Sequence, residues 1–172
     1  SLDNFQNKTL FFDEDLEHIA KYLSDIDDWA TKNGKDFYYV IVPDKNKIYG
    51  ENITTLKKLR PDSESRANQL VNYLHQNTKI KVIYLYDVLT LNKPNGLLYY
   101  KTDTHWNDFG AFLGYQEIIN KIKEHHRNIR PISYNETEYK SLERGDLTKM
   151  LGDNDLIDLT KYKSPIIKDF SK

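Results

Sequence analysis

The sequence contains no cysteine among its 172 residues. This excludes thiol catalysis, thiolate metal ligands and disulfide bonds. No apolar run reaches the roughly 18 residues that a membrane-spanning helix requires, and the acidic, polar start does not resemble a signal peptide. Neither sign of charge is in excess, because 25 basic and 26 acidic residues give a net charge of -1. The chain therefore has no global field that attracts nucleic acid or an anionic membrane, and we expect no nucleic-acid partner.

Several familiar ligand-binding motifs are also missing. There is no H-E-x-x-H metal motif, no carboxylate-rich calcium loop and no clustered histidine pair with a third ligand. The glycine-rich phosphate loops G-x-x-x-x-G-K-S/T and G-x-G-x-x-G are absent as well. The sequence therefore predicts an activity that uses no metal, no nucleotide and no other cofactor.

What is present fits an α/β protein of one domain. Apolar residues recur at spacings of three and four over residues 13–33, 67–77 and 107–126, which predicts three amphipathic helices. Short apolar runs at residues 37–42 and 80–86 are typical of buried strands. This alternation predicts a layered sheet of mainly parallel strands flanked by helices. A length of 172 residues is ordinary for a single domain with one core.

Other segments carry less regular signals. Residues 97–101 are compatible with a third, shorter extended segment, and residues 145–151 with a short helix that Gly152 ends. The Pro-Asp-Ser run at residues 61–63 offers helix-start chemistry for the second helix. Ser164 precedes a proline, which favours a turn.

The strongest chemical signal is the pair Asp103 and His105. It lies where the apolar run 97–100 gives way to the third predicted helix, for which Asn107 is the expected N-cap. In open α/β sheets, loops at the carboxyl ends of strands are where sites are built. A carboxylate that accepts from an imidazole fixes its tautomer and stabilises its cationic form, which is what a histidine needs to deprotonate a serine hydroxyl. The spacing therefore predicts two members of a hydrolytic triad.

Two further regions are candidate substrate contacts. Lys45 and Asn46 lie just beyond the first predicted strand, so they face the same cleft as His105 if the strands run parallel. The alternative is a solvated turn, because the surrounding residues are ordinary turn formers. Trp106 is an aromatic neighbour of the pair, and it is more typical of a packing residue than of a sugar platform.

A nucleophile is not evident. No serine stands in a Gly-Asp-Ser or Gly-x-Ser-x-Gly setting between a strand and a loop. Ser63 and Ser65 fit a helix start, and Ser171 lies one residue from the end, where no strand can be assigned. We therefore identify no nucleophile in this chain.

The residues that carry the pair resemble a known family. The run at residues 102–107, followed by Gly110 and Ala111, is similar to the signature of alginate O-acetyltransferase proteins of the AlgJ and AlgX type. The resemblance extends to residues 42–46 and 145–147, and covers roughly residues 35 to 152 by the order of its elements.

The resemblance implies an SGNH-hydrolase-like, flavodoxin-like fold that moves acetyl groups onto hydroxyls of an exported polysaccharide such as alginate. Asp103 would orient His105, His105 would be the general base, and a downstream serine in a Gly-Asp-Ser-Phe-like stretch would form the acetyl-enzyme. Lys45, Asn46, Trp106 and Asp146 are the candidate substrate contacts.

The resemblance also implies a setting for the protein. A membrane-bound acetyl donor is the implied partner, and the periplasm or the extracellular face of a bacterial membrane is the implied location. Because no such serine stretch is present, we expect residues 1–172 to be a single SGNH-hydrolase-like domain or its N-terminal portion, inactive alone.

Three alternatives stay open at this point. The first is a carbohydrate acetylesterase, which shares the acyl-enzyme and differs only in its acceptor. The second is a noncatalytic carbohydrate-binding or scaffold domain of the same fold. The third is a plain α/β domain in which Asp103 caps the following helix and His105 is buried and hydrogen-bonded.

Overall fold

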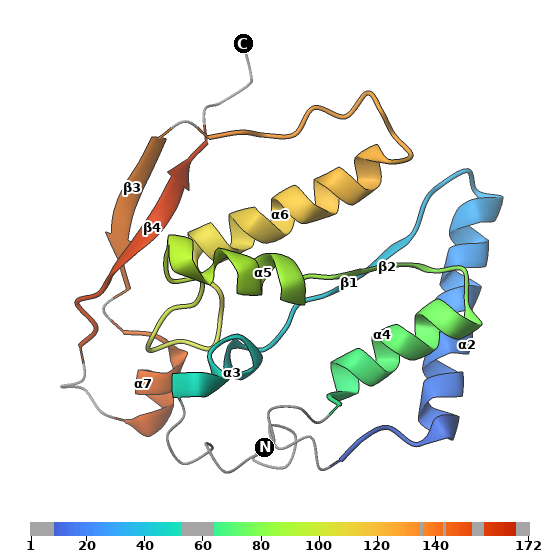
Figure 1. Ribbon diagram of the computed structural model, residues 1–172, viewed down its shortest axis with the longest axis horizontal. Helices are drawn as coiled ribbons and strands as arrows, with labels where there is room; N and C mark the ends of the chain where they lie inside the picture. Colours follow the sequence, from blue (N-terminus) through green and yellow to red (C-terminus); the bar gives the residue numbers. More distant parts are fainter. Residues whose placement is uncertain (1–8, 53–63, 135, 143, 153–156, 168–172) are drawn as a thin grey trace. The chain divides into compact units, whose positions relative to one another are not determined.

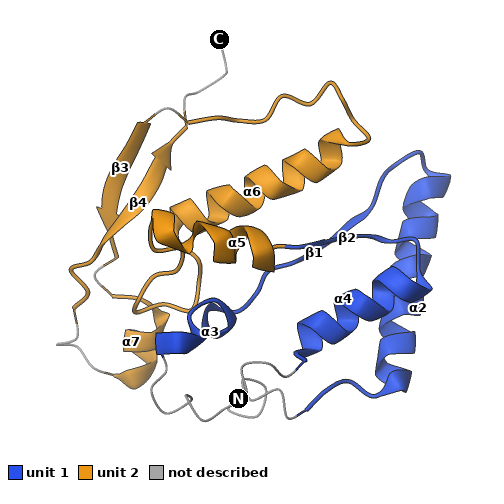
Figure 2. Cartoon of the chain, in the orientation of Figure 1, with its two compact units in different colours: residues 1–84 blue, residues 85–172 orange. Residues whose placement is uncertain are grey.

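The structure is a computed structural model that describes residues 9–52, 64–134, 136–142, 144–152 and 157–167 (Figure 1). The chain divides into two compact units, residues 1–84 and residues 85–172 (Figure 2). The expectation of a single domain stays a prediction, and each unit is described by itself.

The first unit contains helices and a pair of parallel strands. Its elements are α2 (Asp13–Lys32), β1 (Tyr38–Ile41), α3 (Lys45–Ile48), η1 (Gly50–Asn52), α4 (Arg66–Asn77) and β2 (Lys81–Tyr84). Strand β1 pairs with β2 in parallel, from Tyr38 opposite Lys81 to Ile41 opposite Tyr84. The core is formed by apolar residues at helical spacing on α2 and α4, together with Ile80 just before β2: Leu16, Ala20, Leu23, Leu70, Leu74 and Ile80.

The second unit carries the remaining elements. They are α5 (Tyr86–Asn92), η3 (Lys93–Asn95), α6 (Asp108–Lys123), β3 (Glu136–Ser141), α7 (Asp146–Leu151) and β4 (Lys161–Ile166). Strands β3 and β4 pair antiparallel, and β4 packs against α6. Helix α6 buries Phe109, Phe112 and Leu113 on one face.

The α/β class is confirmed, but the predicted extent of the sheet is not. Within the described ranges the strands form two separate pairs, one parallel and one antiparallel. The predicted strand 80–86 ends at Tyr84 because the chain turns into α5, a helix that the sequence analysis missed. The predicted helix 67–77 begins at Arg66 with Ser65 as its N-cap, and the predicted start at residues 61–63 lies outside the described residues.

The expected extended segment at residues 97–101 is not a strand. Tyr99 forms a single antiparallel bridge with Trp106. The backbone groups that a strand would offer to a neighbour are used within the same loop, where the Asn107 N–H donates to the Leu98 carbonyl at 2.9 Å. The segment is therefore one arm of a closed loop that presents residues 102–105.

The prediction of a turn at Ser164 is wrong. Ser164 lies in β4 and is 2% exposed. Its hydroxyl donates to the Asp108 carboxylate at 2.7 Å, which satisfies a buried polar group inside the sheet. The following Pro165 is tolerated because a two-stranded ribbon has an edge on each strand, where a missing N–H costs no hydrogen bond.

Candidate active site

The site is built on the loop that joins Tyr99 to Trp106. The bridge between these two residues closes the loop, and the Tyr100 N–H donates to the His105 carbonyl at 3.3 Å. Residues 102–105 form its tip. Both the aspartate and the histidine of the predicted pair are therefore carried by one short, closed turn.

The exit of the loop is fixed by Asn107, which is 1% exposed. Its side-chain oxygen accepts from the Phe109 and Gly110 N–H groups at 3.1 and 3.0 Å, and so caps α6 as predicted. Its amide nitrogen donates to the Leu97 carbonyl at 2.7 Å, on the other arm of the loop. One buried side chain thus joins the helix start to both arms.

Two glycines of α6 allow the loop to lie close to the helix. A Cβ on Gly110 would overlap the carbonyl oxygen of Leu98. A Cβ on Gly114 would lie 2.9 Å from a ring carbon of Trp106. The Trp106 ring therefore packs on Gly114 and is half-buried, which supports its interpretation as a packing residue.

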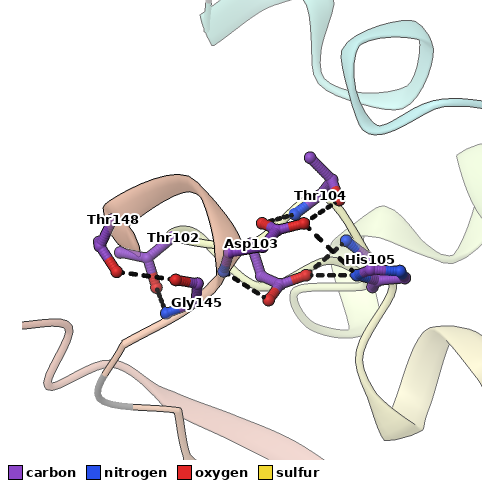
Figure 3. A network of polar contacts seen from close by, with 7 residues as sticks. Thr102, Asp103, Thr104, His105, Gly145 and Thr148 are labelled. Atoms are coloured by element: carbon purple, nitrogen blue, oxygen red, sulfur yellow. Dashed lines mark hydrogen bonds and ion pairs between the residues drawn. The ribbon is translucent and has the colours of Figure 1, made fainter. Parts of the chain in front are cut away.

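Asp103 and His105 form the predicted pair (Figure 3). The Asp103 Oδ1 lies 2.6 Å from the His105 Nδ1, and it also accepts from the His105 backbone N–H at 2.9 Å. The two side chains differ in exposure, at 15% for the aspartate and 74% for the histidine. Among the residues that the structure describes, none hydrogen-bonds the Nε2 of His105. The ring is therefore anchored by one nitrogen and presents the other to its surroundings.

The electrostatics of the pair suit proton transfer. The hydrogen bond and the negative charge of Asp103 raise the pKa of His105, so its cationic form is stabilised. Burial raises the pKa of Asp103, but the hydrogen bonds from the His105 and Asp146 N–H groups and from the imidazole outweigh it. The pKa of Asp103 is lower than that of an ordinary aspartate as a result. Asp103 thus stays ionised as His105 gains a proton.

The first turn of α7 docks on the tip of the loop (Figure 3). The Gly145 N–H donates to the Thr102 hydroxyl at 3.2 Å, and the Asp146 N–H donates to the Asp103 Oδ2 at 2.9 Å. In return, the Thr104 N–H donates to the Asp146 Oδ1 at 2.7 Å, and the Thr104 hydroxyl donates to the other oxygen of that carboxylate. The loop and the helix therefore hold each other through reciprocal hydrogen bonds.

The contact leaves no room for a side chain at Gly145. A Cβ there would overlap the Thr102 carbonyl and lie 2.6 Å from the Asp103 Cβ. The Thr148 hydroxyl donates back to the Gly145 carbonyl at 2.8 Å and is fully buried. Glycine is thus required at this position by close approach of the two backbones.

The third alternative from the sequence is wrong in its details. His105 is exposed and not buried. Asp103 does not cap α6, because that N-cap is Asn107. The Asp103 Oδ2 accepts instead from the backbone N–H of Asp146, the first residue of α7.

One set of described residues has the composition of a metal site. The ligand atoms of Asp103, His105 and Asp146 lie within 4.8 Å of one another. The Asp103 Oδ1 and the His105 Nδ1 lie 2.6 Å apart, which is the length of a charge-assisted hydrogen bond. This bond occupies the imidazole nitrogen that a cation between the two side chains would need as a ligand. The remaining oxygens of both carboxylates accept hydrogen bonds from residues of the loop or of α7. The arrangement therefore fits a hydrogen-bonded pair better than a metal site.

Comparison with protein families decides the relationship. A family described as "SGNH hydrolase-like domain, acetyltransferase AlgX" matches residues 7–169. The chain belongs to this family. The predicted resemblance is confirmed. No curated protein matches the sequence.

Solved structures support the fold of this AlgX-family chain. The O-acetyltransferase domain of Pseudomonas putida AlgJ matches with a TM-score of 0.67 and 20% identity, over 98% of this chain and 62% of that one. Bacillus cereus PatB1, solved with a sulfonyl adduct, matches with a TM-score of 0.63 and 20% identity, over 94% of this chain and 52% of PatB1. A DHHW family protein from Eubacterium siraeum DSM 15702 matches with a TM-score of 0.56 and 19% identity, over 86% and 46% of the two chains. The chain thus spans about half to three fifths of the length of these relatives.

The structure separates the remaining candidate residues. Asp146 lies at the pair, with its Oδ2 3.7 Å from the His105 Nδ1. Lys45 and Asn46 are in the first unit. The segment for which a solvated turn was the alternative is the four-residue helix α3. Their role as substrate contacts stays a prediction.

Sequence reasoning missed the part played by Thr102 and Thr104. Neither residue type signals a site, and the partners of both lie more than 40 residues downstream. The sequence offered the predicted helix start at Gly145 and the family resemblance of residues 145–147, and neither predicted a contact with Thr102 or Thr104. In the described part of the AlgX-family chain, no helix is both long and apolar enough to cross a membrane.

Proposed function

We propose that this chain contributes the aspartate and histidine of a Ser-His-Asp site that transfers acetyl groups to hydroxyls of an exported polysaccharide. The observation that carries the proposal is the 2.6 Å contact between Asp103 and His105, with the histidine Nε2 presented outward. The family description supports acetyl transfer. The AlgJ relative, an O-acetyltransferase domain, supports an oxygen acceptor.

The reaction follows the acyl-enzyme scheme. The His105 Nε2 removes the serine proton as the serine oxygen attacks the acetyl carbonyl, and the tetrahedral oxyanion collapses with loss of the donor's leaving group, which takes that proton. An acceptor hydroxyl then attacks the acetyl-serine while His105 takes its proton. When the second intermediate collapses, the proton returns to the serine and the acetyl ester leaves on the acceptor. Asp103 stays ionised throughout and stabilises the imidazolium.

The nucleophile comes from outside the described residues in this proposal. Among the residues that the structure describes, no serine hydrogen-bonds His105. Ser171 lies outside them. The relatives are longer than this chain, which supports a serine contributed by another part of the protein.

The acceptor and donor are proposed from the family alone. A membrane-bound protein that donates acetyl groups, an alginate-like polysaccharide and an extracytoplasmic location are all consistent with the AlgX and AlgJ relationship. Exclusion of water by a bound acceptor would make the protein a transferase, and free access of water would make it an acetylesterase.

The test is a transfer assay on the protein that contains this chain, with an activated acetyl ester as donor and a polysaccharide as acceptor. We expect His105→Ala to lower kcat by about 1000-fold or more. The matched control is His75→Ala, which removes an exposed histidine of α4 in the other unit and should leave the rate unchanged.

Two results separate the alternatives. Acetyl release to water at the same rate with and without polysaccharide would identify an acetylesterase. Equal rates in the wild type and in His105→Ala would overturn the catalytic proposal and leave a binding domain as the function to test. Because neutral His105 is the base and its pKa is raised, activity should fall on acidification at a higher pH than an ordinary histidine would give.

A further inference from the structure

Asp146 contacts the predicted pair in a way that the acetyl-transfer scheme does not use. It is the first residue of α7 and lies 43 residues from Asp103 in the sequence. Three of its atoms face the loop: its backbone nitrogen and both of its carboxylate oxygens. The question is whether these atoms bind substrate or hold the pair.

Asp103 accepts hydrogen bonds on both of its carboxylate oxygens. Its Oδ1 serves His105, and its Oδ2 accepts from the Asp146 N–H at 2.9 Å. Two bonds on different oxygens fix the plane of a carboxylate, since rotation about its Cβ–Cγ bond would break both. The Asp146 N–H therefore determines the direction from which Asp103 meets the imidazole.

The carboxylate of Asp146 acts on the residue between the pair. Its Oδ1 accepts from the Thr104 N–H at 2.7 Å, and its Oδ2 accepts from the Thr104 hydroxyl. Thr104 is thus held by its backbone and its side chain at once. Thr104 is joined by peptide bonds to both Asp103 and His105. Hydrogen bonds that hold Thr104 therefore also hold the turn that brings the two side chains together.

We propose that Asp146 is a positioning residue for the Asp103–His105 pair, and that it does not bind substrate. It holds Asp103 through its backbone N–H and holds the turn through Thr104. Both of its carboxylate oxygens are engaged by the loop, which argues against the role of substrate contact. The inference rests on the proposed function only in taking proton transfer by His105 as the property that positioning serves.

The Asp146 charge also faces the imidazole. Its Oδ2 lies 3.7 Å from the His105 Nδ1, and after Asp103 it is the second carboxylate that favours the protonated ring and raises its pKa. Geometry and charge can be separated by substitution. Asp146→Asn keeps an acceptor for the Thr104 N–H and loses the charge, whereas Asp146→Ala loses both.

The first experiment uses NMR to follow the imidazole C–H resonances of His105 in this chain as the pH of the solution is varied. We expect both variants to lower the pKa of His105, because both remove the second carboxylate. The matched controls are Asp13→Asn and Asp13→Ala, which remove an exposed carboxylate from the same first helical position of α2. These control variants should leave the pKa of His105 unchanged.

The second experiment measures kcat and KM of the same variants in the protein that contains this chain. A misplacement of about 1 Å costs up to about 100-fold in rate. We therefore expect Asp146→Ala to lower kcat by about 10- to 100-fold with KM little changed. Asp146→Asn should keep most of the rate and move the acidic limb of the pH profile to lower pH. Thr104→Val, which removes only the hydroxyl bond, should give a smaller loss of kcat.

The outcomes distinguish this inference from the proposed function. A raised KM with unchanged kcat in Asp146→Ala would mean direct substrate contact and would overturn the positioning role. So would a pKa of His105 and a kcat that match those of Asp13→Ala. Loss of transfer in His105→Ala with none in Asp146→Ala overturns only the positioning role. Full transfer in His105→Ala overturns the proposed function, and the NMR result still decides whether Asp146 controls the pair.

Discussion

Replacement of Asn107 by alanine tests how the catalytic loop is held to its helix. The side chain is buried and makes three hydrogen bonds: two accepted from the Phe109 and Gly110 N–H groups, and one donated to the Leu97 carbonyl. Alanine removes all three. The loop then loses its connection both to the start of α6 and to its own opposite arm.

The cost follows from these contacts. Loss of the N-cap costs about 0.5–2 kcal/mol, and leaving the Leu97 carbonyl without its partner costs about 1–3 kcal/mol more. We expect Asn107→Ala to lower the free energy of unfolding by about 1.5–5 kcal/mol. Asn107→Ser, which keeps a capping oxygen and loses the amide donor, should give an intermediate value.

The assay is urea unfolding followed by far-UV circular dichroism, with Ser65→Ala as the matched control. Ser65 caps α4 by accepting the Asn68 N–H, and its hydroxyl donates to the Asn68 side chain in the same helical turn. Unlike Asn107, it therefore makes no bond, within the described residues, to a carbonyl on another arm of a loop. Its loss should therefore cost only the cap, about 0.5–2 kcal/mol. If Asn107→Ala is no more destabilising than Ser65→Ala, the reasoning that Asn107 ties the two arms of the loop is refuted.

Two further substitutions test the packing around the site. Gly145→Ala places a Cβ against the Thr102 carbonyl, so it should separate α7 from the loop and lower the thermal unfolding midpoint. The decrease should be larger than that of the control Gly152→Ala, whose Cβ meets open space at φ +66°. Equal decreases in the two variants would contradict the close approach at Gly145. Burial and the Asp158 carboxylate raise the pKa of Tyr162 to about 12. Tyr162→Phe should cost about 1–3 kcal/mol in chemical denaturation, because the Asp158 Oδ2 and the Lys101 N–H both lose their hydrogen bond to the Tyr162 hydroxyl, while the Asp158 Oδ1 keeps the Thr160 N–H. An unchanged midpoint would contradict this.

Helices α2, α4 and α6 were predictable because their signal is local. Burial of α2 and α4 follows the apolar spacing of residues such as Leu16, Leu23 and Leu74, and Asn107 announces the start of α6. Strand β3 was not predictable, because five of its six residues are exposed and it carries no alternation of apolar and polar side chains. Its pairing with β4 is decided by a partner about 25 residues away, which no local pattern encodes.

The contacts of the candidate site also fall into local ones, which were predictable, and long-range ones, which were not. The contact between Asp103 and His105 spans two residues, so their spacing alone predicted it. The docking of α7 spans 43 residues and depends on Thr104 and on the absence of a side chain at Gly145. The family resemblance suggested Asp146 as a substrate contact, and no local pattern indicated that its carboxylate faces the loop.

The central claim is that His105, oriented by Asp103, activates a serine for acetyl transfer. The most direct measurement treats the protein that contains this chain with a sulfonyl fluoride and locates the adduct by mass spectrometry, since the PatB1 relative was solved with a sulfonyl adduct. We predict modification of one serine, with a rate that falls by about 1000-fold in His105→Ala and strongly in Asp103→Asn. Equal labelling in the wild type and in His105→Ala, or no labelled serine at all, would contradict the account.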